Sequence, residues 1–183
     1  MIEVKLNGRG GGPAMTTATI LASAFMRAGR QVQAFPSPEI PRLWAPCSAF
    51  LRVDDETISV RCAPTEFDHL VFFDKALLDL SGSLEGLKPS GWILLDHPGK
   101  PQELEKERTH IAAIDSRRIA ELCGSEKKGK AVRAAAMAGA FARATGLLTV
   151  EALCDSIKES ASSESSAQIT AARVAYEEVS LKP

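Results

Sequence analysis

Four glycines in five positions, spread over residues 8–12, separate an apolar strand-like segment from a helical one near the start of the chain. Because glycine lacks a Cβ atom, such a turn can adopt positive φ and can direct several backbone N–H groups towards one point. The helix that follows adds its unpaired N–H groups and the positive end of its dipole. The pattern predicts a tight strand–turn–helix unit that is suited to contact an anion or a partner molecule.

Two common nucleotide-binding motifs do not fit this turn. A dinucleotide fingerprint needs G-x-G-x-x-G, and Pro13 occupies the position of its last glycine. The second strand ends in Ala34-Phe35-Pro36, where an acidic residue would be needed to bind ribose. A P-loop is excluded because no Gly-Lys-Ser/Thr follows. A packing turn without a ligand and a free-standing anion- or nucleotide-binding α/β protein both stay open as alternatives.

Alternating strand and helix signals along the chain predict an α/β fold. We expect strands at residues 2–6, 31–35, 69–73, 91–95 and 111–114, with a hairpin of residues 47–53 and 57–61 inserted among them. We expect helices at residues 14–28, 75–80, 116–122, 130–144, 150–158 and 169–179, with turns at residues 88–91 and at Gly124. The first unit predicts a parallel crossover between the first two strands.

The expected architecture is a three-layer α/β/α fold with a mixed, largely parallel sheet, the inserted β-hairpin and a helical C-terminal part. We assign residues 1–158 to one α/β domain and residues 159–183 to a polar connection and a C-terminal helix. Residues 36–46 contain four prolines, so that they can form neither a regular helix nor a central strand.

Composition narrows the range of functions. The net charge of −1 and the isoelectric point of about 6.3 provide no long-range field for nucleic acid or an anionic membrane. No signal peptide and no run of roughly 18 apolar residues is present, which predicts a cytoplasmic protein. The four cysteines form no C-x-x-C pair, and His69, His97 and His110 lack metal-ligand spacing. We therefore expect neither a metal site nor a catalytic residue on this chain.

Two blocks of sequence resemble one family. Residues 2–16 contain a strand, Gly8-Arg9-Gly10-Gly11-Gly12 and then Thr16, and residues 33–36, 42 and 45–52 contain A-F-P, an arginine, A-P and A-F-x-R motifs. Both resemble the gamma subunits of 2-oxoacid (pyruvate or ketoisovalerate):ferredoxin oxidoreductases. A weaker similarity surrounds Ala138-Gly139-Ala140. The chain departs from the family pattern at Gly12 (usually Gln), Pro13 (usually Gly), and Leu43 and Trp44 (usually Arg and Gly).

The resemblance implies a non-catalytic subunit of a coenzyme A-dependent enzyme that oxidatively decarboxylates a 2-oxoacid to acyl-CoA and passes electrons to ferredoxin. Thiamine diphosphate, magnesium, iron–sulfur clusters and coenzyme A would then belong to the holoenzyme, with no cofactor on this chain. Its partners would be alpha, beta and ferredoxin-like delta subunits. An indolepyruvate-type oxidoreductase is the alternative complex, and a homodimer of the isolated chain stays open.

The resemblance also implies that each of the two blocks contains candidate site residues. The anion or partner contact would comprise Gly8, Arg9, Gly10, Gly11, Gly12 and Thr16. The proline-rich segment would be a docking loop, whose interface residues are Arg42, Leu43, Trp44 and Pro46. An aromatic side chain such as Trp44 is a common anchor at interfaces, although folding of Trp44 onto its own domain is the competing interpretation.

Overall fold

Seven strands and six helices make up the described part of the chain in the computed structural model, which describes residues 1–38, 42–101, 110–123, 129–160 and 165–182. The strands are β1 (Ile2–Arg9), β2 (Gln31–Pro36), β3 (Pro46–Asp54), β4 (Phe67–Phe72), β5 (Leu87–Asp96), β6 (Ile111–Ile114) and β7 (Ser180–Lys182). The helices are α1 (Ala14–Arg27), α2 (Lys75–Leu78), α3 (Ser116–Leu122), α4 (Gly129–Thr145), α5 (Val150–Glu159) and α6 (Ser165–Glu178).

The seven strands form one mixed sheet in the order β2-β3-β1-β4-β5-β6-β7. Strands β1, β4, β5 and β6 pair in parallel, whereas β3 is antiparallel to both β1 and β2, and β7 is antiparallel to β6. Five strands therefore run in one direction, and the predicted mixed, largely parallel sheet is confirmed. The first two strands are parallel as expected, but β3 lies between them.

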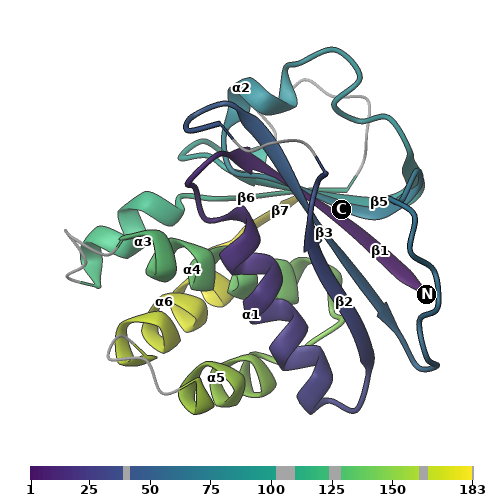
Figure 1. Cartoon of the computed structure of the whole chain (residues 1–183). Coiled ribbons are helices and arrows are strands. Elements are labelled where there is room, and N and C mark those ends of the chain that lie inside the picture. The colour runs from purple at the N-terminus through teal and green to yellow at the C-terminus, as the bar shows by residue number, and fades with distance from the viewer. Residues whose placement is uncertain (39–41, 102–109, 124–128, 161–164, 183) are drawn as a thin grey trace.

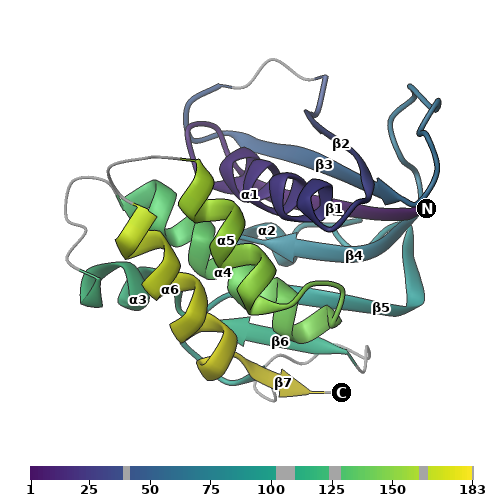
Figure 2. The same ribbon diagram turned by 90° about the horizontal axis from the view of Figure 1, so that it is seen from below.

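Helices cover both faces of the sheet, which confirms the predicted α/β fold. Figures 1 and 2 show α1, α3, α4, α5 and α6 on one face and α2 on the other. Each face has its own apolar core, and the larger one lies beneath the five helices. Four alanines of α1 are buried, at positions 14, 18, 22 and 24. Their small side chains bring the glycine turn at the start of α1 close to the sheet.

The predicted hairpin is wrong in its second strand. Residues 57–61 form no strand, and β3 pairs instead with β1 and β2. The guanidinium of Arg52 is 1% exposed and donates hydrogen bonds to the carbonyl oxygens of Val60 and Cys62 at 3.2 and 2.6 Å. Gln33 donates another to the carbonyl oxygen of Ile58 at 3.1 Å. Side chains from β2 and β3 therefore satisfy backbone groups that the predicted hairpin would have paired.

The C-terminal part contains an element that the pattern did not predict. Helix α6 begins earlier than expected and is followed by β7, which adds the last strand to the sheet (Figure 2). The assignment of residues 159–183 to a separate part stays a prediction, although α6 packs against α4 in the larger core.

Residues 88–91, predicted as a turn, lie within β5. Gly124, the predicted helix stop, and residues 161–164 of the polar connection lie outside the described residues.

Candidate functional site

The glycine turn joins β1 to α1 in a compact backbone conformation. The N–H of Gly12 donates to the carbonyl oxygen of Arg9 at 2.8 Å, and Gly11 has a φ of 81°. Such a φ is readily available only to glycine, which explains why the turn requires this residue there. Because the N–H groups of Gly10 and Gly12 are already bonded within the chain, these two donors are not available to an anion.

The turn and the proline-rich segment form one structural unit. Gly10 makes a parallel bridge with Leu43, donates to the carbonyl oxygen of Ala45 at 2.9 Å and accepts from the N–H of Trp44 at 3.2 Å. A Cβ atom on Gly10 would lie 2.0 Å from the carbonyl oxygen of Arg42. The two sequence blocks that were singled out separately therefore contact each other through backbone hydrogen bonds.

Arg9 connects this unit to the end of β4. Its Nε atom lies 2.8 Å from Oδ2 of Asp74, and its Nη1 atom donates to the carbonyl oxygen of Trp44 at 3.3 Å. Burial alone would raise the pKa of Asp74, but the hydrogen bond from the N–H of Ala76 and the charge of Arg9 outweigh burial and lower it. Asp74 therefore stays ionised at neutral pH and holds Arg9 against the loop.

The predicted interface residues project into solvent. Leu43 is 71% and Trp44 72% exposed, and Arg42 and Pro46 are also exposed. The isolated chain thus does not bury Trp44 in its own domain, contrary to the competing interpretation. Trp44 also has a φ of 66°, the positive value that side-chain-bearing residues rarely adopt. Pro41, in the same predicted loop, lies outside the described residues.

A cavity of about 240 Å³ lies over the glycine turn. Gly10, Gly11 and Gly12 line it together with Met15, and Lys130 at the start of α4 also lines it. Sequence reasoning missed Lys130, because nothing local in the sequence indicates that α4 begins beside the turn. Thr16 lies in the first turn of α1 but does not line this cavity. The structure thus groups Arg9, Gly10, Gly11 and Gly12 with the docking loop and leaves Thr16 aside.

The histidines singled out by their chemistry lie elsewhere. His69 is partly buried, accepts a hydrogen bond from the N–H of Trp92 at Nδ1, and contacts the ring of Phe141 edge-on. Burial lowers its pKa to about 4, so that it is neutral in the folded protein. His97 lines a separate cavity of about 500 Å³ at the ends of β4, β5 and β6.

Among the residues that the structure describes, no group of three or more His, Cys, Asp or Glu side chains could hold a metal ion. None of the helices in the described ranges is long and apolar enough to cross a bilayer.

Comparisons with known proteins identify close relatives over nearly the whole chain. Residues 3–178 match the model of the family described as pyruvate ferredoxin/flavodoxin oxidoreductase. The chain is 38% identical to the pyruvate/ketoisovalerate oxidoreductases common subunit gamma of Thermococcus kodakarensis, over 87% of this chain and 86% of the relative. It is 37% identical to pyruvate synthase subunit PorC of Methanothermobacter marburgensis, over 98% of both chains.

A solved structure supports the same relationship. The crystal structure of pyruvate oxidoreductase subunit PORC from Thermotoga maritima superposes with a TM-score of 0.84 at 30% identity. The superposition covers 100% of this chain and 98% of that one. The similarity therefore includes the glycine turn, the sheet and the helical C-terminal part together.

Proposed function

This chain belongs to the pyruvate ferredoxin/flavodoxin oxidoreductase family, and we propose that it is the gamma subunit of a 2-oxoacid:ferredoxin oxidoreductase complex. That complex oxidatively decarboxylates a 2-oxoacid such as pyruvate or ketoisovalerate, transfers the acyl group to coenzyme A and passes electrons to ferredoxin. The observation that carries the proposal is the near full-length match to gamma subunits, together with the exposed Leu43–Trp44 pair.

The chain contributes an interface to this complex and leaves the chemistry to its partners. Thiamine diphosphate, magnesium, the iron–sulfur clusters and coenzyme A are assigned to the assembled enzyme, with alpha, beta and ferredoxin-like delta subunits as the other chains. The docking surface consists of Arg42, Leu43, Trp44 and Pro46. Two large apolar side chains in solvent are unfavourable for an isolated protein, and a partner that covers them removes this cost.

The geometry supports a preformed docking surface. Backbone bonds to Gly10 and the hydrogen bond from Arg9 hold the backbone of Trp44 in place before any partner binds. A loop whose backbone is already ordered loses less conformational entropy on association. Arg42 makes no ion pair with any described residue, so that its charge is available to a carboxylate on the partner.

Co-purification from the native host tests this function. The tagged wild-type chain is expected to recover a thiamine-diphosphate-containing protein and an iron–sulfur protein. The Trp44→Ala and Leu43→Ala variants should recover much less of both, whereas Leu122→Ala, which alters an exposed leucine far from the loop, should behave like the wild type. Recovery of neither protein by the wild-type chain would contradict the subunit role.

Two alternative functions can be distinguished from the gamma-subunit role by the proteins recovered in co-purification and by the melting temperature of the isolated chain. An indolepyruvate-type oxidoreductase would be recognised by a different large subunit among the recovered proteins. A free-standing nucleotide-binding protein would recover no partner, and its melting temperature would rise with NAD(P), FAD or ATP alone.

A further inference from the structure

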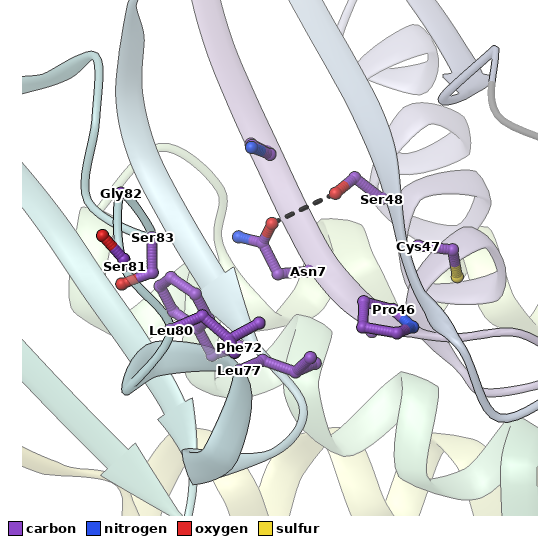
Figure 3. A pocket seen from close by; sticks show the side chains of 12 residues that line it. Asn7, Pro46, Cys47, Ser48, Phe72, Leu77, Leu80, Ser81, Gly82 and Ser83 are labelled. Atoms are coloured by element: carbon purple, nitrogen blue, oxygen red, sulfur yellow. Dashed lines mark hydrogen bonds between the residues drawn. The ribbon is translucent and has the colours of Figure 1, made fainter.

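Strand β2 forms one edge of the sheet and pairs with β3 alone among the described strands. The pairing is continuous over the whole of β2 and contains no bulge. On its other side β3 pairs with β1, where the hydroxyl of Ser48 also donates to Oδ1 of Asn7 at 3.1 Å (Figure 3). The outer side of β2 is therefore an open edge of the sheet, which can be followed in Figures 1 and 2.

The register shows which backbone groups of β2 point away from β3. Hydrogen-bonded and non-hydrogen-bonded residue pairs alternate along an antiparallel ladder. The N–H of Ser37 donates to the carbonyl oxygen of Ser48 at 2.8 Å, so that every second residue before Ser37 also faces β3. The N–H and C=O groups of Val32 and Ala34 therefore point outwards, and no described backbone group bonds to them. Pro36 fits the same outward position because it has no N–H.

This edge lacks the charged side chains that usually protect an open strand. Gln31–Pro36 contains no ionisable residue, and its one protective feature is Pro36 at its end. At the opposite edge of the sheet, β7 has only three residues and carries Lys182. A longer, uncharged edge such as β2 is the kind that accepts another strand.

Helix α1 extends the uncharged surface above this edge. Its only ionisable residue is Arg27, which forms an ion pair within the same chain. Met15 lines the cavity over the glycine turn together with Pro36, which places Met15 on the side of α1 near the β2 edge. Thr19 and Met26 follow on the same side of the helix, and both are exposed. Because 25% of the whole chain is charged, an exposed helix side without charge indicates a covered surface.

A second copy of the chain fits this edge about a two-fold axis. In an antiparallel pairing centred on Ala34, the N–H and C=O groups of the two Ala34 residues would bond to each other. The N–H of each Val32 would bond to the C=O of Pro36 in the other copy, and the N–H that proline lacks would remove only the outermost bonds. No like charges are opposed in this register. A partner that recognises charge would find none here, whereas an identical surface needs none.

The same pairing brings the two copies of α1 together on one face of the sheet. Helix α1 packs against both β2 and β3. Because neighbouring strands are about 4.8 Å apart, two helices above the β2–β3 boundaries would be roughly 10 Å apart, close to the usual distance of packed helices. Thr19 lies about 6 Å along α1 from Met15, and Ala34 lies about 7 Å along β2 from Pro36. Thr19 would therefore lie near the axis, above Ala34.

We propose that two copies of this chain pair antiparallel along β2, with Ala34 and Thr19 near the two-fold axis, so that one sheet continues through both copies. This dimer does not depend on the gamma-subunit role, because it involves no other kind of chain.

Sedimentation equilibrium of the full-length chain over a concentration series tests the dimer. The wild type is expected to dimerise, and Thr19→Glu should weaken dimerisation at least about tenfold, because it places two like charges beside the axis. The matched control is Thr170→Glu on α6. Both threonines are exposed, and each donates its hydroxyl to the carbonyl oxygen four residues earlier at 3.0 Å. Thr170→Glu should dimerise like the wild type.

Hydrogen exchange measured by NMR tests the pairing itself. The amides of Val32 and Ala34 should exchange at least about tenfold more slowly at concentrations where the chain is dimeric than where it is monomeric. Ala34→Pro removes the central outward donor at a position where an edge strand tolerates proline, and it should be folded by circular dichroism but monomeric. A chain that is monomeric at every concentration would overturn the proposal. So would a dimer that leaves these amides unprotected or that persists unchanged in Thr19→Glu.

Discussion

The carbonyl oxygen of Arg42 lies 2.0 Å from the position that a Cβ atom would occupy on Gly10. Real Cβ atoms do not approach a backbone oxygen so closely, so that only glycine permits this contact. It allows the backbone of Leu43 and Trp44 to bond to the glycine turn, and both residues lie exposed at the surface. The glycine turn thus supports a protein-facing loop, in addition to linking β1 to α1.

Substitutions in the turn should therefore differ in severity. Gly10→Val should destabilise the chain by more than about 3 kcal/mol, because the loop must move away to admit the side chain. Gly11→Val should cost about 1–3 kcal/mol because its φ is 81°. Gly12→Gln, which introduces the usual family residue, should cost less than Gly10→Val, because a Cβ atom at Gly12 would lie 2.8 Å from the carbonyl oxygen of Arg9, a milder clash than the 2.0 Å contact at Gly10. Urea denaturation measures the ranking, and equal effects at all three positions would contradict the backbone constraint.

Trp44 is expected to lower the stability of the isolated chain slightly and to strengthen binding to the partner proteins. Trp44→Gly should leave the isolated chain as stable as the wild type or up to about 1 kcal/mol more stable, because glycine adopts a φ of 66° without strain. Trp44→Ala retains the strained φ and should not stabilise the chain. Both variants should lose the partner proteins in co-purification. A wild-type level of recovery with either variant would show that the indole is not an anchor.

The buried guanidinium of Arg52 should be essential for stability. Its Nε atom lies 2.8 Å from Oε1 of Glu3, and Arg52→Met would leave this carboxylate and two carbonyl groups without their donor. We expect a loss of about 3–5 kcal/mol in the free energy of unfolding. The matched control is Arg27→Met, which removes an exposed pair with Glu159 and should cost at most about 0.5 kcal/mol. Similar losses in the two variants would contradict this assignment.

Helices α4 and α6 cross at a glycine. A Cβ atom on Gly139 would lie 2.1 Å from the carbonyl oxygen of Ala172, so Gly139→Ala should push the helices apart and cost about 2 kcal/mol or more. Gly129 begins the same helix, and a Cβ atom there meets nothing within 4 Å. Gly129→Ala should therefore be neutral or stabilising by up to about 1 kcal/mol. Thermal unfolding of the pair tests whether close packing or helix propensity dominates.

His69 should make stability depend on pH. Burial, with a smaller effect of the Lys88 charge, lowers the pKa of His69 from 6.5 to about 4, although Asp68 opposes this shift. Between these values the unfolded chain binds a proton that the folded chain does not, so stability falls as pH falls. We expect a loss of about 2 kcal/mol between pH 7 and pH 5. His69→Asn retains an acceptor for the N–H of Trp92 and should lose most of this dependence in urea titrations.

Local patterns predicted most elements and both sequence blocks of the candidate site. Apolar runs located the central strands because a strand buried on both faces has little polar sequence. The predicted helix at residues 150–158 begins beside Thr149, a favourable N-cap residue, whose Oγ1 atom accepts from the N–H of Ala152. The second strand of the hairpin was wrong because residues 57–61 alternate like a strand while their carbonyl groups bond to side chains from β2 and β3. Strand β7 was missed because three residues carry too short a pattern.

The sequence by itself determined the family, the strand–turn–helix opening and the direction of most strands, because these depend on residues close together in the chain. Only the tertiary structure decided that β3 separates β1 from β2, that Arg42 contacts Gly10 and that Lys130 lies beside the turn. Such contacts join segments that are distant in the sequence. They form only because burial of the apolar cores on the two faces of the sheet fixes the order of its strands.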